Sequence, residues 1–278
     1  MTTIILSYEP AIRFSFFAVI FSLMTLWERA APRRTQHISR RLRWTNNLLI
    51  LLIDILTLRL LLPLAAVGFA LQIEEQGWGL LNILQLPVAM SMLLAVVTLD
   101  FAIYLQHRLF HAVPWFWRLH RMHHADLEFD VTTAVRFHPV EILLSMAIKL
   151  LVIFLLGAPA LAVLIFEVLL NATSLFNHSN VQLPAHFDRW LRRILVTPEM
   201  HRVHHSIRRE ETNSNFGFNL PWWDHIFKTY RAQPSAGHIS MTIGLEDFRD
   251  VEELKLHRML LQPWRSSQQE AADTPDKK

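Results

Sequence analysis

The sequence predicts an all-helical membrane protein: a bundle of about three spanning helices and a short helical hairpin, with a helical cap on the cytoplasmic side. Hydrophobic residues make up 52% of the 278 residues and charged residues only 18%, whereas a soluble surface needs more charge. Long apolar runs recur up to residue 176, and no later run is long enough to span a membrane. The chain has no cysteine, which excludes disulfides and thiolate-held iron–sulfur clusters.

The apolar runs give the spans in order. Residues 14–27 with their flanks form a first span, residues 48–73 a second and residues 86–105 a third. The first run has no small-residue cleavage site, so it is interpreted as a retained anchor. Between the first two spans lies a short loop of six arginines: Arg29, Arg33, Arg34, Arg40, Arg41 and Arg43. We interpret it as a solvated cytoplasmic loop that sets the topology or touches anionic lipid head groups.

Residues 142–176 are too long for one spanning helix, because a helix of that length measures about 50 Å against a hydrocarbon core of about 30 Å. The sequence Gly157-Ala158-Pro159 near the middle predicts a break. We therefore expect a hairpin of two short helices, 142–156 and 160–176, which returns the chain to the cytoplasmic face. The predicted divisions are membrane anchors over 1–85, a catalytic domain over 86–264 and a disordered tail over 265–278.

Eight of the fifteen histidines fall into three compact groups. The first has the pattern H-x3-H, and the other two share the pattern H-R-x-H-H. Their members are His107 and His111; His120, His123 and His124; and His201, His204 and His205. Residues three or four apart share a helix face, whereas adjacent residues diverge by about 100°. Adjacent histidines can therefore address two different metal ions.

Clustered imidazoles repel one another when protonated and lack acceptors when neutral, and a shared cation resolves both problems. Neutral imidazole binds iron, zinc and copper well. In the predicted topology the third span and the hairpin bring all three groups to the cytoplasmic face. The sequence therefore predicts a dimetal site held between the two halves of the chain.

Other polar residues follow the helical spacing of the histidines. Asp100 shares a stripe with His107 and His111, and Glu167 and Asn171 share one with His178. Acidic groups inside a span are functional candidates. Asp100, Glu167 and Asn171 are expected to orient a ligand histidine as acceptors behind it, with interhelical pairing as the alternative for the two acids.

The remaining histidines are either candidate metal ligands or residues expected to be structural or exposed. His178 is expected to be a further ligand because it ends its stripe on the metal side. His138 can be a ligand or can cap the following helix. His225 lies among aromatic residues and is expected to be structural. The others are expected on the surface: His37, His186, His238 and His257.

These motifs resemble the fatty acid hydroxylase superfamily, the membrane histidine-box proteins that include sterol desaturases. The resemblance runs from about residue 88 to 230 and depends on the three histidine groups in order. Smaller matches are Asn177-His178-Ser-Asn180, Thr197-Pro-Glu-Met-His201, and Asn215-Phe-Gly-Phe followed by Trp223-Asp. Two departures are His225, where many relatives have arginine, and the lack of a second histidine paired with His178 at short spacing.

The resemblance implies two iron ions, O2 as co-substrate, a lipid substrate and a separate electron donor such as a reductase, ferredoxin or cytochrome. It implies these ligands: His107, His111, His120, His123, His124, His201, His204 and His205, with His178 as a ninth and His138 as a candidate tenth. The implied activity is hydroxylation or desaturation of a sterol, fatty acyl chain or related lipid.

Three alternatives remain beside this activity. An ether-lipid monooxygenase belongs to the same superfamily. A membrane metal transporter or sensor is a different class, but a transporter should place its ligands near the bilayer midplane. A zinc hydrolase should leave an open coordination position with few histidines and a carboxylate base, and no H-E-x-x-H motif is present.

Overall fold

A computed structural model describes residues 2–62 and 65–266 of the chain, so most of the predicted tail lies outside the described residues. All named elements in these ranges are helical, and two isolated bridges pair Pro32 with Val181 and Ser206 with Ile243. Within these ranges, five helical segments are long and apolar enough to cross a membrane. The predicted all-helical membrane fold is confirmed.

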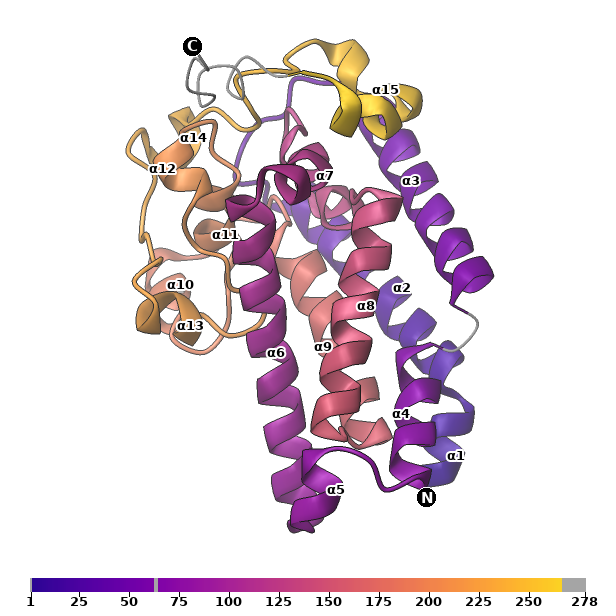
Figure 1. The fold of residues 1–278 in the computed structure, drawn as a ribbon. Helices are drawn as coiled ribbons and strands as arrows, with labels where there is room; N and C mark the ends of the chain where they lie inside the picture. Colours follow the sequence, from indigo (N-terminus) through magenta and orange to yellow (C-terminus); the bar gives the residue numbers. More distant parts are fainter. Residues whose placement is uncertain (1, 63–64, 267–278) are drawn as a thin grey trace, which may run out of the picture.

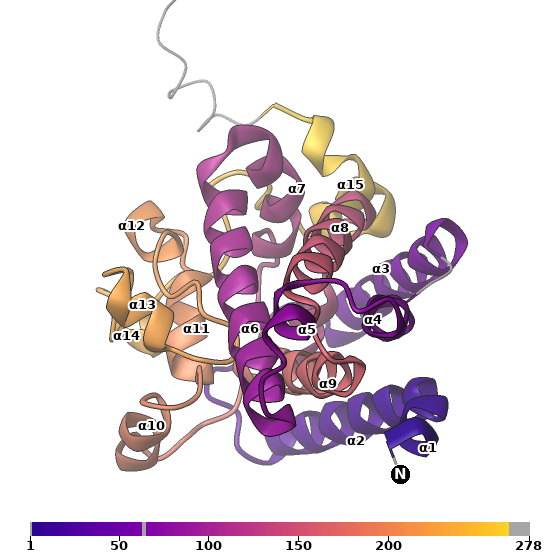
Figure 2. The same ribbon diagram turned by 60° about the horizontal axis from the view of Figure 1, so that its bottom comes forward.

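The bundle is formed by eight helices of the chain's first two thirds. They are α1 (Thr2–Ser7), α2 (Glu9–Ala30), α3 (Arg40–Leu61), α4 (Ala66–Glu75), α5 (Leu80–Leu84), α6 (Val88–Ala112), α8 (Pro139–Leu156) and α9 (Ala160–Asn177). The long helices run between the end that holds the N-terminus and the opposite end (Figure 1). Helix α9 is central, because it packs against α2, α4 and α6 and is the most buried of the candidate spans (Figure 2).

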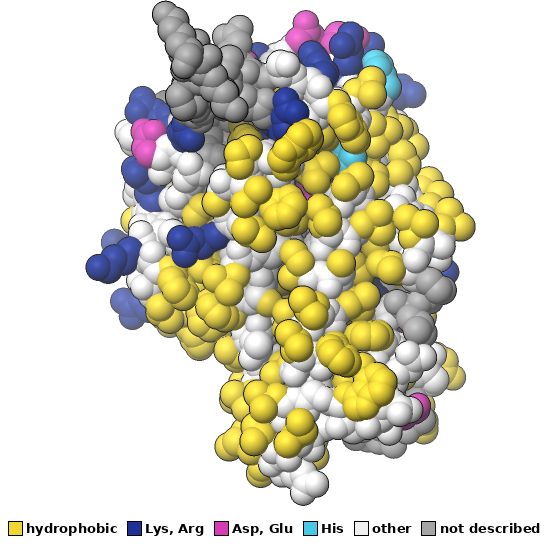
Figure 3. All heavy atoms as spheres, viewed as in Figure 1, with side chains coloured by type: hydrophobic (Ala, Val, Ile, Leu, Met, Phe, Trp, Pro, Cys, Tyr) yellow, Lys and Arg dark blue, Asp and Glu magenta, His cyan; other side chains and the backbone are white. Residues whose placement is uncertain are grey.

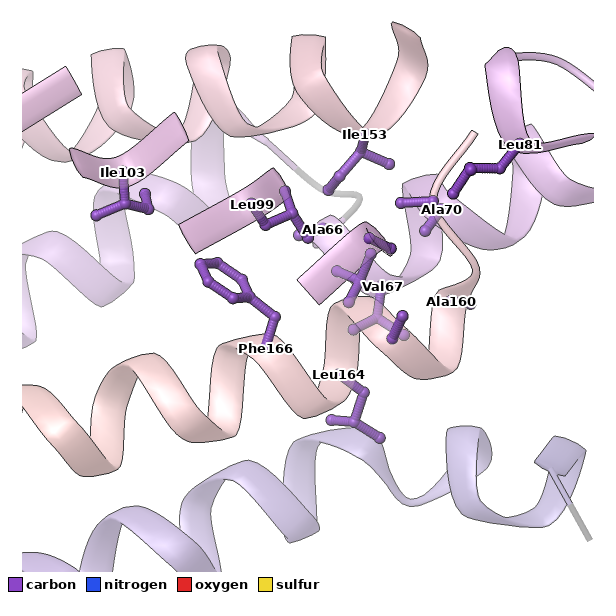
Figure 4. Packing of buried hydrophobic residues seen from close by; sticks show 14 residues of the cluster. Ala66, Val67, Ala70, Leu81, Leu99, Ile103, Ile153, Ala160, Leu164 and Phe166 are labelled. Atoms are coloured by element: carbon purple, nitrogen blue, oxygen red, sulfur yellow. The ribbon is translucent and has the colours of Figure 1, made fainter. Parts of the chain in front are cut away.

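The apolar core of the bundle is built from bulky side chains between closely packed helices. Phe166 reaches from α9 toward Leu99 of α6, and Ile153 of α8 lies close by (Figure 4). Ala66 and Ala160 are completely buried at the same level. Small residues let membrane helices approach closely, which fits the packing of α4 against α9.

Short helices form a cap at the end of the bundle opposite the N-terminus, and the cap extends down one side so that α10 and α13 lie beside the middle of α6 (Figure 1). They are α7 (Pro114–His124), η1 (Val131–Val135), α10 (Ala185–Leu191), α11 (Pro198–His204), α12 (Arg209–Thr212), α13 (Trp222–Ile226), α14 (Gly237–Ser240), η2 (Val251–Leu254), α15 (Leu256–Leu261) and η3 (Gln262–Trp264). The three predicted histidine groups all lie on or beside elements at this end.

The predicted hairpin forms as expected. Helix α8 ends at Leu156, Gly157 adopts φ +65°, and α9 begins at Ala160. A Cβ at Gly157 would lie 2.4 Å from the carbonyl oxygen of Trp78. Glycine is therefore required both by the left-handed turn and by the close approach of the neighbouring loop.

The second predicted span is not one helix. Helix α3 ends at Leu61 and α4 begins at Ala66, so residues 48–73 cross in two pieces. The sequence explains the break, because Pro63 follows Leu62 and a residue before proline is driven out of the helical region. Together α3 and α4 still lead from the cap to the far end of the bundle (Figure 1).

The arginine-rich segment is only partly solvated: Arg29 and Arg41 are exposed as expected, whereas Arg43, in the first turn of α3, is not. Arg43 is completely buried, and its guanidinium pairs with Asp126 at 2.7 Å and also with Asp130. Arg33 Nε donates to Glu199 Oε1 at 2.6 Å. The acids are far away in sequence, so the run of arginines alone did not indicate burial. Buried ion pairs of this kind hold two segments in one arrangement. Here they join the arginine-rich segment to the cap.

Candidate metal centre

The histidines come from four elements that meet at the cap end of the bundle. His107 and His111 lie in the last two turns of α6, and His178 is the residue that caps α9. The two H-R-x-H-H segments end α7 and α11. Each of these short helices begins with proline at its first turn, a position where proline is favoured because its missing N–H is not needed.

The structure brings nine histidines together in two groups. In each group, every histidine offers one ring nitrogen, and these nitrogens all lie within 4.8 Å of one another. The first group is His107, His111, His120, His124 and His204, and the second group is His123, His178, His201 and His205. Each H-R-x-H-H segment contributes to both groups. The segment on α7 gives two histidines to the first group and one to the second, whereas the segment on α11 gives one to the first and two to the second. The divergence of adjacent helical residues thus sends His123 and His124 to different groups, as it does His204 and His205.

Backbone carbonyls fix the orientation of three of these rings. Nδ1 of His107 lies 2.8 Å from the carbonyl oxygen of Phe216, and Nδ1 of His204 lies 2.7 Å from that of Ser214. Nδ1 of His178 lies 2.8 Å from the carbonyl oxygen of Ser174. A carbonyl only accepts, so each Nδ1 carries the proton and each Nε2 presents a lone pair to its group.

Side chains support two further rings of the first group. Nδ1 of His120 lies 2.6 Å from Oε1 of Glu141, which is buried at the start of α8. Nδ1 of His111 lies 3.2 Å from Oδ1 of Asn213. Sequence reasoning missed Glu141, because it lies 21 residues from His120 and on another helix. A carboxylate behind a ligand histidine is the usual arrangement at metal sites.

The donor set fits metal ions, as the unpartnered nitrogens show. Seven buried ring nitrogens of the two groups have no hydrogen-bond partner: Nε2 of His111, His124 and His204, Nδ1 of His123 and His201, and both nitrogens of His205. Buried polar atoms are normally paired. In the second group, Nε2 of His178 lies 3.1 Å from Nε2 of His123 and 3.0 Å from that of His201. Such spacings are those of two nitrogens on one ion with bonds of about 2.1 Å.

Burial keeps these imidazoles neutral, which is the form that binds metal. It lowers the pKa of His120 to about 3, and it does the same for the pKa of His178. For His124 and His205, burial first and neighbouring histidines second hold the pKa well below the usual value. At neutral pH the cluster therefore offers uncharged lone pairs rather than imidazolium ions.

The three residues expected to orient ligand histidines have other partners. Asp100 Oδ2 accepts from Trp223 Nε1 at 2.7 Å. Glu167 pairs with Lys149 of α8 and with Arg13 of α2, the latter at 2.7 Å. The side-chain amide of Asn171 donates to the carbonyl of Glu167, one turn earlier, at 2.7 Å. The interhelical pairing given as the alternative describes Glu167, since helices α2 and α8 supply its partners.

The remaining histidines lie outside both groups. His138 caps α8, because its Nδ1 accepts from the backbone N–H of Val140 at 3.2 Å. His37, His186 and His257 are exposed as expected, and His225 is exposed and stacks on Tyr230. The prediction that His238 is a surface residue was wrong: it is buried, and its Nε2 lies 2.9 Å from Oε2 of Glu199.

Comparison with known proteins identifies the part of the chain that holds this centre. The family model for fatty acid hydroxylase matches residues 92–229, which include all nine histidines of the two groups. The chain carries a fatty acid hydroxylase domain. The resemblance seen in the sequence is thus confirmed, with nearly the same bounds.

Curated relatives of the fatty acid hydroxylase domain act on several lipids. The chain is 34% identical to the ornithine lipid hydroxylase OlsE of Rhizobium tropici over 160 residues, which are 57% of this chain and 47% of that protein. It is 26% identical to the alkylglycerol monooxygenase of Homo sapiens over 163 residues, 57% of this chain and 34% of that protein. It is also 26% identical to a Delta(7)-sterol 5(6)-desaturase of Gibberella zeae, over 58% of this chain and 45% of that protein.

These matches cover less than half of each of the three relatives' own lengths. The likeness therefore belongs to the domain rather than to the whole proteins. No solved structure matches the chain.

Proposed function

We propose that this protein is a multi-pass membrane di-iron oxygenase that uses O2 and external electrons to hydroxylate or desaturate a lipid. The observation that carries the proposal is the pair of histidine groups, with five and four ligand atoms, inside a fatty acid hydroxylase domain. Two iron ions bound there would supply the activation of O2 and the removal of hydrogen from an unactivated C–H bond. Nine histidines and one nearby carboxylate favour such a centre over a zinc hydrolase.

The chain's own residues would hold and enclose the centre. The histidines would provide the ligands, and the carbonyls of Phe216, Ser214 and Ser174 would hold three of the rings in place. Phenylalanine rings pack over the imidazoles: that of Phe137 stacks on His123 with ring centroids 4.4 Å apart. Apolar rings around a reactive centre exclude water and prevent side reactions.

The topology supports an active site at the cytoplasmic membrane face. The arginine-rich segment, the cap and both histidine groups lie at one end of the bundle (Figure 1), and arginines near span ends mark the cytoplasmic side. A lipid would then approach sideways from the bilayer, and a separate electron donor would approach from the cytoplasm. A transporter is less well supported, because its ligands should follow a path across the midplane.

A second candidate within the domain's family is cleavage of an ether lipid, and the likeness to an alkylglycerol monooxygenase favours it. The same centre would serve both reactions. Mass spectrometry of lipids from cells with and without the protein separates them. Hydroxylation adds one oxygen and desaturation removes two hydrogens, whereas ether cleavage removes the intact alkylglycerol.

The direct test is metal analysis with oxygen uptake. Protein produced with iron present should hold two irons per chain and consume O2 with its lipid and a reductant. His123→Ala should hold one iron and lose all turnover, because it removes a ligand of the second group. His225→Ala is the matched control, since His225 is exposed and outside both groups. Full activity of His123→Ala, or protein that retains no iron, would refute the assignment.

A further inference from the structure

One flank of the cap exposes apolar side chains that are not needed for the histidine centre. Six large residues of helix α10, helix α13 and the turns after them are each at least 40% exposed: Phe187, Trp190, Ile194, Trp222, Ile226 and Phe227. We call this surface the α10–α13 flank. Its two helices are joined, because Trp222 Nε1 donates to the carbonyl of Arg193 at 2.7 Å. Single exposed apolar residues are ordinary, but a contiguous set marks an interaction surface.

Helix α13 packs beside the middle of α6, which is one of the candidate membrane spans. Trp223 packs on Phe101 of α6 with ring centroids 4.7 Å apart, and its Nε1 donates to Asp100. Phe101 lies midway along α6, about 20 Å from the start of that helix at 1.5 Å per residue. The hydrocarbon core is about 30 Å thick. A span that begins with α6 therefore still lies in hydrocarbon where α13 packs against it.

The lipid-facing surface of α6 continues past this level. Leu105 and Leu109, one and two turns nearer the cap, are 43% and 40% exposed. Figure 3 shows hydrophobic side chains over the bundle and also on its left flank, with basic side chains along the left edge. The α10–α13 flank therefore lies beside the hydrophobic surface of the bundle.

The charges around the flank suit lipid head groups. Arg189, Arg193 and Lys228 are exposed beside the apolar residues, and the guanidinium of Arg108 lies 5.7 Å from the ring of Phe227. Lysine and arginine extend their stems along apolar surface and place their charges at phosphates. We propose that the α10–α13 flank inserts into the interfacial layer of the bilayer, with its apolar side chains among acyl chains and its cations at anionic head groups.

This insertion would set the height of the histidine centre. Asp224 of α13 accepts from the backbone N–H of Phe216 at 2.8 Å and from that of Gly217 at 2.9 Å. The carbonyl of Phe216 in turn accepts from His107. The depth of α13 in the bilayer is therefore transmitted through two residues to a ring of the first group.

Spin labels on single cysteines test the insertion, because the chain has no cysteine of its own. The full-length protein is placed in nanodiscs of equal parts phosphatidylcholine and phosphatidylglycerol. Ile226→Cys reports on the flank, and Ile239→Cys on α14 is the matched control, since the two isoleucines are 63% and 59% exposed. Leu93→Cys, on the lipid-facing side of α6 and 65% exposed in the native residue, is the membrane reference.

The readout is the collision rate of each label with O2, which concentrates in lipid, and with a water-soluble nickel complex. The ratio of O2 to nickel collisions at position 226 should match position 93 and exceed that at position 239 several-fold. A ratio at 226 equal to that at 239 would overturn the proposal. Low collision rates with both reagents at 226 would also overturn it, because they indicate a protein contact such as a second copy. Trp190→Cys repeats the measurement should Ile226→Cys fail to fold.

Discussion

The two histidine groups differ in what holds their rings. In the first group, Nδ1 of four of the five histidines faces an oxygen: Phe216 for His107, Asn213 for His111, Glu141 for His120 and Ser214 for His204. In the second group only His178 has such an acceptor, and Nδ1 of His123, His201 and His205 has no partner. An acceptor behind the ring fixes both its tautomer and its direction. The first site is therefore set by the protein, whereas the second depends more on the bound ion.

The imidazoles of both groups are held neutral by burial, and the dependence of stability on pH is the strongest test of this shared property. Burial lowers the pKa of His120 and of His178 from 6.5 to about 3. Between these values the unfolded chain binds more protons than the folded one, so stability falls as pH drops from about 6.5 toward 3. Each of the two histidines should contribute about 1.4 kcal/mol per pH unit in this window. Guanidinium unfolding of the metal-free protein in detergent at stepped pH measures the slope.

The control for this slope is the removal of one titrating ring. His178→Ala should reduce the slope by about 1.4 kcal/mol per pH unit, and His225→Ala, which changes an exposed ring, should leave it unchanged. A free energy of unfolding that does not change with pH in this window would show that the imidazoles are not held neutral by burial.

Weakening the support of the first group should make it resemble the second. Glu141→Gln keeps the shape at His120 but replaces the carboxyl acceptor by an amide, so iron affinity of the first site should fall about 10–100-fold. Competition with a chelator measures the affinity. Glu210→Gln, at a carboxylate 58% exposed, is the control and should leave both sites unchanged. Equal affinities for Glu141→Gln and the native protein would mean that the carboxylate does not support the ring.

The native protein should also release its two ions in order. Because three rings of the second group have no acceptor behind Nδ1, the second site should lose iron at about tenfold lower chelator concentration than the first. Removing His123 should then abolish the early step, and removing His124 the late step. Simultaneous loss of both ions in the native protein would contradict the inequality between the groups.

The sequence predicted those features of the centre that depend on residue spacing along one helix. The spacing i, i+3, i+4 placed the histidines on shared faces and sent His123 and His124 in different directions, and Gly157 marked the hairpin. The acceptors could not be predicted, because the Phe216 carbonyl belongs to the backbone and Glu141 lies on another helix. Asp100 lies on the same face of α6 as His107. Helical spacing does not show, however, that Trp223 of α13 donates a hydrogen bond to its carboxylate.

The smallest expected effect concerns the helix that serves both groups. Thr197 caps α11: its Oγ1 accepts from the N–H of Met200 at 3.3 Å and donates to Asp188 at 2.6 Å. Thr197→Ala should cost about 1 kcal/mol, and because α11 carries ligands of both groups, iron retention at both sites should fall about fivefold. Thr197→Ser should restore it, since the hydroxyl returns. Ser39→Ala removes the cap of α3, far from the histidines in sequence, and should lower stability without changing the ratio of the two iron affinities. A loss confined to one site would show that α11 does not move as a unit and that its two groups are held separately.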